Sequence, residues 1–423
     1  MNPSMNGRGE AASGRPQASP RMERDHAGRK PRIVILGAGC SGISTAVRLQ
    51  KRLHLSEADV TLVNKHDYHY FNTQLHRTAA GAIRPEQTRV RVTDLLLEAK
   101  VHFCKGEVRA IKPRERKVVL DHGVLSYDYL VVGLGGEPET SGIPGMEEFA
   151  LTIRSLNSVR MIRQHVEYML AKSKREPQRA SYLTFAVCSA DATGVDFAEE
   201  LADQLPQLCR RYDVEPSLTR IIHFDVVSSL QEAGQQGKPQ AQADKSGVFH
   251  YKGIEFRQGT AVRACTPEGL VLADGERLDA GTVIWNGGVK GSLLLAAAGL
   301  DTIQGRVRVD AQLRSPQHPE IWVVGENAVL PGVQNPVARS TAELALLQGK
   351  HAADVLLAKL RGRKEPVWAY KASMLDSPGN AAARLSGARG LRQAAFKAAA
   401  NLRGMLRIGG LGLVWRKAIF RRD

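Results

Sequence analysis

The feature of this sequence that most constrains its fold is an apolar segment that runs directly into a glycine-rich turn. Residues 31–42 read Pro-Arg-Ile-Val-Ile-Leu-Gly-Ala-Gly-Cys-Ser-Gly, so that Gly37, Gly39 and Gly42 have the spacing G-x-G-x-x-G. Such a turn binds the pyrophosphate of a dinucleotide when a strand precedes it and a helix follows it. A buried strand predicted over 32–36 meets the first condition.

The residues that follow the turn meet the second condition. A helix is predicted over 41–53 and a second strand over 59–63, which completes a β-α-β unit of about 30 residues. The helix N-terminus points free N–H groups at the pyrophosphate, and the third glycine lets the helix pack closely on the strand. Asn64 stands where an acid usually binds the ribose, and its amide forms hydrogen bonds without a charge. We therefore expect an adenine dinucleotide at this turn.

A second segment has the same strand-then-turn shape, but its turn is altered. Residues 183–194 read Leu-Thr-Phe-Ala-Val-Cys-Ser-Ala-Asp-Ala-Thr-Gly, with Ser189 and Asp191 in the places of the first two glycines. Thr193 and Gly194 remain around the changed positions. Two such units in one chain indicate a flavoprotein that takes electrons from a nicotinamide nucleotide, and the altered turn makes the nicotinamide site the open question.

The remainder of the second unit is regular. A helix is predicted over 194–205 and a strand over 220–224, which ends at Asp225, where a carboxylate binds a ribose 2′-hydroxyl and disfavours a 2′-phosphate. Asp191 brings a negative charge to the pyrophosphate, and like charges about 4 Å apart cost on the order of 1–4 kcal/mol. The affinity for NADH would then fall roughly tenfold or more unless a basic side chain compensates. Alternatively, Asp191 caps the helix that begins here, and the sequence leaves both interpretations open.

Cysteine spacing and hydropathy exclude several classes of protein. The five cysteines form no C-x-x-C pair, which excludes a zinc ribbon and the usual redox disulfide and indicates a reducing compartment. We expect most of them to be buried and inert, and we predict no metal site. No run of 18 or more apolar residues occurs, so no segment is expected to span a membrane.

Positive charge is concentrated toward the C-terminal end. The chain carries a net charge of +16, and residues 361–423 contain 14 Lys and Arg against three acids, a net charge of +11. No nucleic-acid recognition motif or aromatic stacking platform accompanies this charge, so we expect no nucleic-acid partner. An anionic membrane surface is the better match for a basic segment with an apolar stripe.

That stripe lies on a helix predicted over residues 391–407, whose opposite face is basic. Its apolar face comprises Leu391, Ala395, Ala398, Leu402, Met405 and Leu406. Such a helix is expected to lie in the plane of the lipid headgroups, with Trp415 in an apolar patch beyond it. The alternative is that the stripe packs on the preceding domains. At the other end, residues 1–30 are rich in Gly, Pro, Ser and charge and are typical of a disordered tail.

Further motifs occur in the order found in one known family. They are Tyr68-His69-Tyr70-Phe71, Leu75-His76-Arg77-Thr78-Ala79-Ala80-Gly81, Tyr129-Leu130-Val131-Val132-Gly133, Trp285-Asn286-Gly287-Gly288-Val289, Gly325-Glu326 and Gly409-Gly410-Leu411-Gly412-Leu413-Val414-Trp415-Arg416-Lys417. From about residue 31 to 423 the chain resembles the type II NADH:quinone oxidoreductases of bacterial membranes. The resemblance implies an α/β fold with two Rossmann-like dinucleotide-binding domains, a two-dinucleotide-binding flavoprotein, and a C-terminal amphipathic helical segment that associates with membranes.

The resemblance also implies a division of the chain and an FAD site. The parts are a disordered tail at 1–30, the first part of an FAD-binding domain at 31–150, an NAD(H)-binding domain at 151–300, the second part of the FAD-binding domain at 301–360, and the basic membrane-associating segment at 361–423. FAD is expected against Gly37, Gly39 and Gly42, with Gly325 and Glu326 at its ribityl–phosphate region. The family usually has Gly-Asp there, and Glu is one methylene longer.

The family transfers a hydride from NADH to the flavin and then two electrons from the flavin to a quinone. Its A-Q-x-A-x-Q-Q-G pattern at the quinone becomes Ala-Glu-Leu-Ala-Leu-Leu-Gln-Gly at 342–349, so that Glu343 and Leu347 replace two glutamines. Ala342 keeps the helix closely packed near the flavin. Asp196 matches a family glutamate and is a candidate proton relay near the flavin ring. Its alternative role is that of a solvated or capping carboxylate.

The interpretation is therefore an NADH:quinone-type enzyme at the cytoplasmic face of a bacterial membrane, with FAD and NADH as cofactors. Its acceptor is a quinone or another small molecule, and a homodimer is left open. A first alternative is a sulfide:quinone-type flavoprotein, which needs a cysteine pair flanking the flavin, and Cys188 and Cys265 are the candidates in the second domain. A second alternative is a non-catalytic FAD-binding paralogue whose NADH site has decayed.

Overall fold

A computed structural model describes residues 28–140, 142–189, 192–226, 248–333 and 341–369. The predicted tail at 1–30 therefore lies outside the described residues except for its last three. The predicted amphipathic helix at 391–407 lies outside them entirely. In the part of the chain that is described, no helix has both the length and the apolar character needed to cross a membrane.

The first half of the molecule is built on a five-stranded parallel sheet. Its strand order is β23-β9-β1-β2-β5, with β23 (Ile321–Val323), β9 (Tyr129–Val132), β1 (Arg32–Leu36), β2 (Asp59–Asn64) and β5 (His102–Lys105). Strands β1, β9 and β23 are almost continuous apolar runs because helices and other chain segments cover the faces of such a sheet. Strand β23 comes from a late part of the sequence, so this sheet joins two distant segments of the chain.

The second half is built on a six-stranded sheet from the middle of the sequence. Its order is β11-β19-β12-β13-β15-β14, with β11 (Leu151–Thr152), β19 (Thr282–Asn286), β12 (Thr184–Ser189), β13 (Arg220–Asp225), β15 (Ile254–Arg257) and β14 (Val248–Tyr251). All neighbours are parallel except β14, which is antiparallel to β15. Strand β12 is buried on both faces, so its side chains alternate between two apolar cores.

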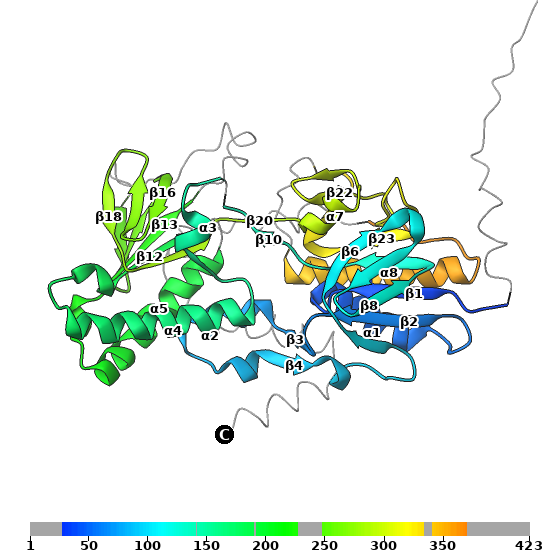
Figure 1. Ribbon diagram of the computed structural model, residues 1–423, viewed down its shortest axis with the longest axis horizontal. Helices are drawn as coiled ribbons and strands as arrows, with labels where there is room; N and C mark the ends of the chain where they lie inside the picture. The colour runs from blue at the N-terminus through cyan, green and yellow to red at the C-terminus, as the bar shows by residue number, and fades with distance from the viewer. Residues whose placement is uncertain (1–27, 141, 190–191, 227–247, 334–340, 370–423) are drawn as a thin grey trace, which may run out of the picture.

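Long helices flank these sheets (Figure 1). Helices α1 (Cys40–Arg52) and α8 (Ala342–Leu360) belong to the first half, and α4 (Leu156–Arg175) and α5 (Ala192–Tyr212) belong to the second. Helix α1 packs against α8 through small polar residues, because the Ser44 hydroxyl donates to the Leu346 carbonyl at 2.7 Å and the Thr45 hydroxyl donates to the Gly349 carbonyl at 3.0 Å. This close contact fixes the position of α8 beside the first glycine turn.

The remaining elements are short. The helices are α2 (Leu75–Ala80), α3 (Met146–Phe149) and α7 (Leu293–Ala297), and the 3-10 turns are η1 (Asn72–Gln74), η2 (Pro85–Thr88), η3 (Val92–Asp94), η4 (Pro113–Glu115), η5 (Ala180–Leu183), η6 (Pro216–Leu218) and η7 (Gly325–Asn327). The strands are β3 (Tyr68–Tyr70), β4 (Arg89–Arg91), β6 (Val108–Lys112), β7 (Lys117–Leu120), β8 (Gly123–Ser126), β10 (Glu137–Pro138), β16 (Val262–Thr266), β17 (Gly269–Leu272), β18 (Arg277–Asp279), β20 (Val289–Lys290), β21 (Thr302–Ile303), β22 (Arg306–Arg308) and β24 (Ala328–Val329).

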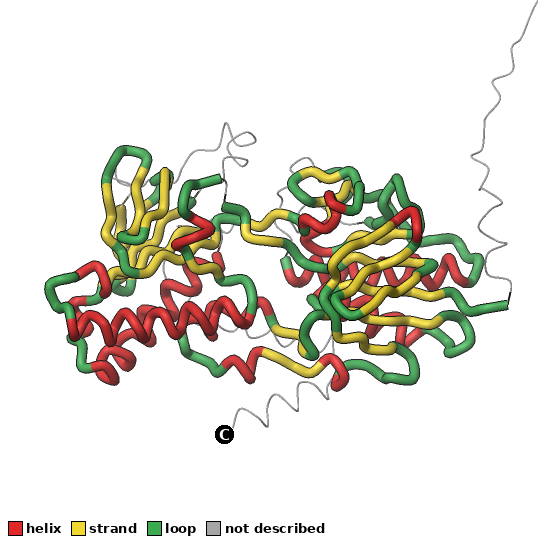
Figure 2. Tube along the Cα trace, in the orientation of Figure 1, coloured by secondary structure: helices red, strands yellow, loops and turns green. Residues whose placement is uncertain are grey.

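Two sets of segments connect the halves, as Figure 2 shows. Strands β10 and β20 pair antiparallel between them, with Glu137 opposite Lys290 and Pro138 opposite Val289. Helix α2 belongs to the first half by sequence, but it packs on α4 and α5 of the second half. The two Rossmann-like domains predicted from the sequence are confirmed. The helix predicted over 41–53 begins and ends one residue earlier than expected.

Candidate functional site

The first glycine turn has the geometry of a phosphate-binding loop. Gly37 has φ +91°, a conformation that a side chain makes costly. A Cβ added at Gly37 would lie less than 3.0 Å from the Gly133 carbonyl oxygen, because the loop after β9 crosses directly over the turn. A Cβ at Gly42 would meet the Gly37 carbonyl oxygen equally closely. Both glycines are therefore required by the packing of the protein itself.

Gly39 has a different environment. It is exposed and caps the N-terminus of α1 with an extended backbone. Beyond its chain neighbours, the nearest described atom to a Cβ at Gly39 is the Gly133 carbonyl oxygen at 4.0 Å. The space over Gly39 is open, and the first turn of α1 points its N–H groups toward it. This combination fits the close approach of a dinucleotide pyrophosphate.

Asn64 supports the turn at the end of β2. Its side-chain oxygen accepts a hydrogen bond from the Ala38 N–H at 3.0 Å, and its amide nitrogen donates to the His66 carbonyl at 2.7 Å. The Ala38 carbonyl in turn contacts Nδ1 of His69 at 2.7 Å. The sequence motif that contains His69 gave no indication of this role, because the contact spans strands that are distant in the sequence.

Gly325 and Glu326 face the same turn from η7. Gly325 has φ +73°, and a Cβ there would lie 2.9 Å from the Ser41 hydroxyl oxygen in the first turn of α1. The Gly325 N–H donates to the Gln348 side-chain oxygen of α8. The two segments of the first half therefore meet at the glycine turn. Gln348 lies within the motif at 342–349, but the sequence did not indicate its hydrogen bond to Gly325.

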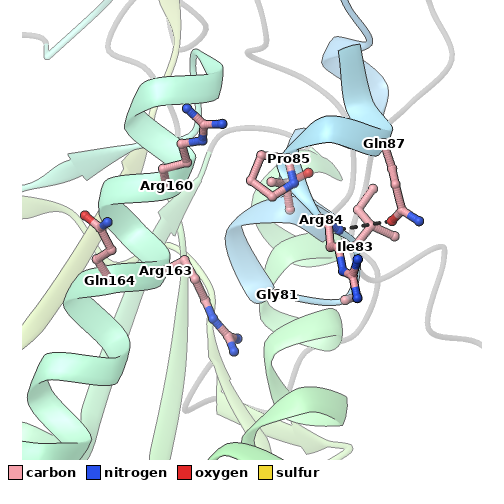
Figure 3. Close-up of a pocket in the computed structure, with 10 residues that line it drawn as sticks. Gly81, Ile83, Arg84, Pro85, Gln87, Arg160, Arg163 and Gln164 are labelled. Atoms are coloured by element: carbon pink, nitrogen blue, oxygen red, sulfur yellow. Dashed lines mark hydrogen bonds between the residues drawn. The ribbon is translucent and has the colours of Figure 1, made fainter. Parts of the chain in front are cut away.

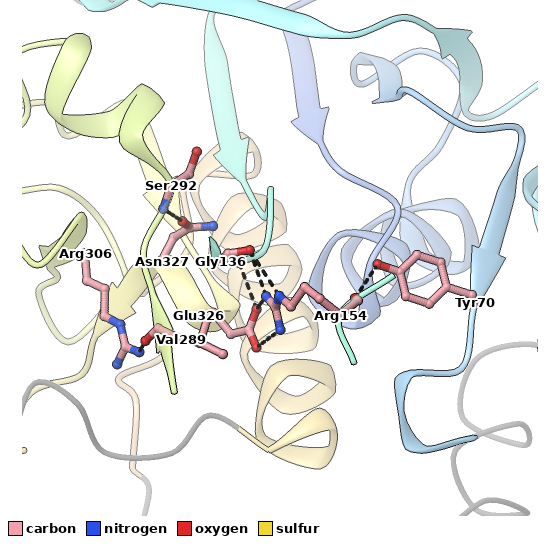
Figure 4. Close-up of polar contacts among 8 residues, drawn as sticks. All are labelled: Tyr70, Gly136, Arg154, Val289, Ser292, Arg306, Glu326 and Asn327. Carbon is pink, nitrogen blue, oxygen red and sulfur yellow. Dashed lines mark hydrogen bonds and ion pairs between the residues drawn. The ribbon is translucent and has the colours of Figure 1, made fainter. Parts of the chain in front are cut away.

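Glu326 lies at the centre of a polar cluster (Figure 4). Both of its carboxylate oxygens accept from the Arg154 guanidinium, one of them at 3.1 Å, and the Gly136 N–H donates to it at 2.8 Å. Arg154 also donates to the Gly136 carbonyl at 2.9 and 3.2 Å. Burial by itself would raise the pKa of the Glu326 carboxyl, but Arg154 and the Gly136 N–H hold that pKa below its usual value.

The charges of this cluster affect the pKa values of two further side chains. Burial, followed by the negative charge of Glu326, raises the pKa of the Cys40 thiol to about 12. Burial also raises the pKa of the Tyr70 phenol, while the charge of Arg154 lowers it. Cys40 follows Gly39 directly, so the field of Glu326 reaches the turn that the sequence assigns to the pyrophosphate.

Helix α8 places the residues predicted for the quinone end. Thr341 caps the helix, since its hydroxyl accepts from the Leu344 N–H at 3.1 Å. Ala342 is half-buried and Glu343 is exposed in the first turn. A Cβ at Gly349 would lie less than 3.0 Å from the Ser41 carbonyl oxygen, so Gly349 is needed for the contact between α8 and α1.

The second turn keeps one contact of the first. A Cβ at Gly194 would lie less than 3.0 Å from the Ser189 Cβ, as a Cβ at Gly42 would meet Gly37. Ser189 is buried and, among the described residues, is not one of those with a positive φ. Strand register places Asp225 beside Ser189 at the ends of β13 and β12. Residues 190 and 191, which include the predicted change at Asp191, lie outside the described residues.

The other residues predicted for the nicotinamide site lie at the start of α5. Thr193 and Asp196 are both half-buried in its first turns, near the carboxyl end of β12. The structure therefore brings together Thr193, Gly194, Asp196 and Asp225 at one edge of the second sheet. In parallel α/β sheets this edge is where ligands bind.

Cys188 and Cys265 do not have the environment of a redox pair. Both lie in the apolar core on one face of the second sheet, together with Met146 and Trp285. Burial raises the pKa of both thiols, that of Cys265 to about 11. They are therefore protonated and enclosed at neutral pH. Of the other three cysteines, Cys209 is also buried, whereas Cys40 and Cys104 are half-buried.

A surface pocket between α4 and the segment from α2 to η2 contains none of the predicted site residues (Figure 3). It is lined by Thr78, Gly81, Ala82, Ile83, Arg84, Pro85, Gln87, Arg160, Arg163 and Gln164. Arg163 donates to the Ala80 carbonyl at 2.9 Å and thereby closes the end of α2. Gly81 has φ +85°, a backbone conformation that other residues rarely adopt, which explains the last glycine of the motif at 75–81.

The chain is similar to known proteins over most of its length. Residues 31–349 match the family model described as pyridine nucleotide-disulphide oxidoreductase. A type II NADH:quinone oxidoreductase of Staphylococcus haemolyticus is 31% identical over 409 residues, covering 92% of this chain and 99% of that relative. One of Staphylococcus saprophyticus is 32% identical over 405 residues, with the same coverage of both chains.

Solved structures share the fold at lower identity. The structure of NDH2 from Plasmodium falciparum in complex with NADH has a TM-score of 0.59 and 19% identity, covering 71% of this chain and 65% of that one. The sulfide:quinone oxidoreductase of Aquifex aeolicus has a TM-score of 0.61 and 18% identity, covering 78% of this chain and 77% of that one. At these identities the likeness shows the fold alone.

Proposed function

Because the chain belongs to the pyridine nucleotide-disulphide oxidoreductases and, within them, to the type II NADH:quinone oxidoreductases, we propose that it passes electrons from NADH through FAD to a quinone. The observation that carries this proposal is the first glycine turn. Gly37 and Gly42 are fixed by packing there, and the open space over Gly39 fits a dinucleotide. The family relation supplies the identity of the dinucleotide as FAD and that of the donor as NADH.

We assign the FAD site to residues of the first half. Gly37, Gly39 and Gly42 would hold the pyrophosphate at the N-terminus of α1, and Asn64 would face the ribose. Gly325 and Glu326 would meet the ribityl–phosphate region. When bound, FAD accepts a hydride and passes its electrons on singly or in pairs, while the protein supplies orientation and electrostatics.

The nicotinamide nucleotide is assigned to the edge of the second sheet. Thr193 and Gly194 would lie at its pyrophosphate, and the Asp225 carboxylate would accept from the ribose hydroxyls and disfavour a 2′-phosphate. Asp196 is proposed to hold or relay a proton near the flavin ring. Its place in the first turns of α5, half-buried near the end of β12, supports that role.

The acceptor is assigned to the region near the start of α8. Ala342 would keep the helix close to the flavin, and Glu343 is proposed as a proton-handling group toward the quinone. Glu343 is exposed in the first turn of α8 and can therefore exchange protons with water. Its negative charge near the helix N-terminus is favourable.

We further propose where the protein acts and how its chain is divided. Residues 31–150 and 301–360 would form the FAD-binding domain, and 151–300 the NAD(H)-binding domain. The basic residues of 361–423 support peripheral attachment to the anionic cytoplasmic face of a bacterial membrane. A homodimer remains a proposal that the oligomeric state in detergent would test.

An anaerobic titration with NADH tests the donor, and a quinone tests the acceptor. We expect NADH to bleach the visible band of the bound oxidised flavin, and a short-chain quinone to restore it. Flavin that stays oxidised at millimolar NADH would refute the proposed donor. Reduction by sulfide in its place would support the sulfide:quinone alternative, against which the enclosed Cys188 and Cys265 argue.

A further inference from the structure

The side chain that interacts most strongly with Glu326 comes from the other half of the molecule. Arg154 follows β11 directly and precedes Ser155, which caps α4. Its guanidinium contacts both oxygens of Glu326 and the Gly136 carbonyl, as Figure 4 shows. Three segments therefore meet at one point, namely the chain after β9, the start of the second half and η7.

The charge of Glu326 is unfavourable for an anionic cofactor unless it is neutralised. FAD carries a pyrophosphate, and the proposed site places this group at the turn of Gly37 and Gly39. The negative charge of Glu326 already acts on Cys40, which adjoins that turn. Like charges in a partly buried site repel each other more strongly than in water. A carboxylate here would therefore weaken the binding of FAD if it stood alone.

We propose that Arg154 supports FAD binding through Glu326, whose carboxylate it neutralises beside the dinucleotide turn. The Glu326 carboxylate contacts both the Arg154 guanidinium and the Gly136 N–H. The bidentate contact suits the planar guanidinium, which stays charged when half-buried. The inference rests on the proposed FAD site.

A second arginine lies near this cluster but does not replace Arg154. Arg306 donates to the Val289 carbonyl, and Arg154 has two hydrogen bonds to the Glu326 carboxylate. Burial lowers the pKa of Arg306, whereas Glu326 raises that of Arg154 above its usual value despite burial. Arg306 also lowers the pKa of the Glu326 carboxyl through its charge, but less than Arg154, to which the main neutralising charge is therefore assigned.

The test distinguishes neutralisation of the Glu326 charge from a purely structural role, in which Arg154 only holds the two halves of the molecule together. FAD release on dilution of the full-length holoenzyme would be followed by the recovery of FAD fluorescence, for wild type, Arg154→Met, Glu326→Gln and the double variant. We expect Arg154→Met to weaken FAD binding by about tenfold or more, because it exposes the cofactor to an unpaired carboxylate. Glu326→Gln should change it by no more than about threefold, since the amide still accepts a hydrogen bond.

The double variant decides between the two explanations. With neutralisation, Arg154→Met combined with Glu326→Gln should restore binding to near the level of Glu326→Gln alone, because the repelling charge is gone. With bridging alone, both single variants and the double variant would be equally impaired, and the proposal would be overturned. Arg154→Lys, which keeps the charge and is the milder change for folding, should stay close to wild type.

Failure of the proposed FAD site and failure of the inference give different results. A wild-type protein that binds no FAD would refute the proposed FAD site, on which the inference rests. An Arg154→Met protein that retains FAD as tightly as wild type would refute only the inference. The thermal unfolding temperature of each holoenzyme in excess FAD shows whether a variant is still folded. If Arg154→Lys lost FAD as readily as Arg154→Met, charge would not be the property that matters, and the proposal would fail.

Discussion

The two β-α-β units of this molecule share a framework but differ in their turns. In the first, Gly37 adopts a left-handed conformation and Gly133 crosses it closely. In the second, Ser189 occupies the equivalent place, and only the third glycine, Gly194, is kept. The third glycine serves helix-to-turn packing in both units, whereas the first two serve the turn and its ligand. The second unit therefore keeps the Rossmann framework without the first two glycines.

Strand register shows that the framework is the same. Leu62 of β2 lies opposite Ile35 of β1, two residues before the strand ends at Asn64. His223 of β13 lies opposite Val187 of β12, two residues before that strand ends at Asp225. The second unit thus buries an imidazole where the first buries a leucine. Four changes to the chain would break or sharpen this comparison.

The largest effect is expected at the first turn. Gly37→Ala should lower the free energy of unfolding by about 3 kcal/mol and abolish FAD retention, because it combines a left-handed backbone with a steric clash. Gly39→Ala is the matched control, since its Cβ has open space in the protein. Gly39→Ala should lose FAD, whereas the free energy of unfolding of the cofactor-free protein should change little. Urea unfolding and the flavin-to-protein ratio measure both effects, and equal destabilisation by the two changes would contradict the assignment.

The next effect depends on pH and concerns His223. Burial lowers the pKa of this imidazole from 6.5 to about 4, and its Nε2 has no hydrogen-bond partner among the described residues. Between these pH values the unfolded chain binds the extra proton, so stability falls as the pH drops and is unaffected above 6.5. The full loss amounts to about 3 kcal/mol below the folded pKa.

His223→Leu makes the second unit match the first and should remove this acid sensitivity. The free energy of unfolding in urea would be compared for wild type and variant between about pH 7 and pH 5, where wild type should lose about 2 kcal/mol more than the variant. Parallel losses in the two proteins would mean that His223 is not the group that titrates.

A smaller effect is expected where the two turns are most alike. Gly194→Ala should destabilise the protein by about 1–3 kcal/mol, because its Cβ would meet the Ser189 Cβ, which cannot rotate away. Adding Ser189→Gly should recover most of the loss. The midpoint of urea unfolding for the single and double variants tests this coupling, and independent, additive effects would show that the two residues do not touch.

The smallest effect is expected in the affinity for NADH. Asp191→Gly should strengthen NADH binding by about tenfold if the carboxylate repels the pyrophosphate. Asp191→Asn separates charge from size, since it removes only the charge. The dissociation constant for NADH would be measured by titration of the holoenzyme. Weaker binding together with lower stability would instead favour the interpretation that Asp191 caps the helix.

Much of the fold could be predicted because its signals are local. The strand predicted over 220–224 is observed at Arg220–Asp225, and the helix predicted over 41–53 at Cys40–Arg52. Apolar runs and glycine spacing are set by neighbours within one β-α-β unit. The residues at the carboxyl ends of strands could be assigned to a ligand for the same reason.

The contacts around the site could not be predicted in this way. Arg154 and Glu326 are 172 residues apart, and Arg163 and Ala80 are 83 apart. No periodicity links such pairs, because their contact depends on how the two sheets are placed relative to each other. The family resemblance drew attention to the motifs at 68–71 and 75–81, but it did not indicate that α2 packs on α4 and α5.

The sequence by itself determined two dinucleotide-binding units, one with an intact turn and one altered, because backbone conformation and strand burial follow from local residue types. Only the tertiary structure decided how Ser189 and Glu326 are accommodated. Ser189 fills the space against Gly194, and Arg154 crosses from the second half to neutralise Glu326 in the first. Steric fit and charge compensation act through space between residues far apart in the chain, so they become visible only once the chain is folded.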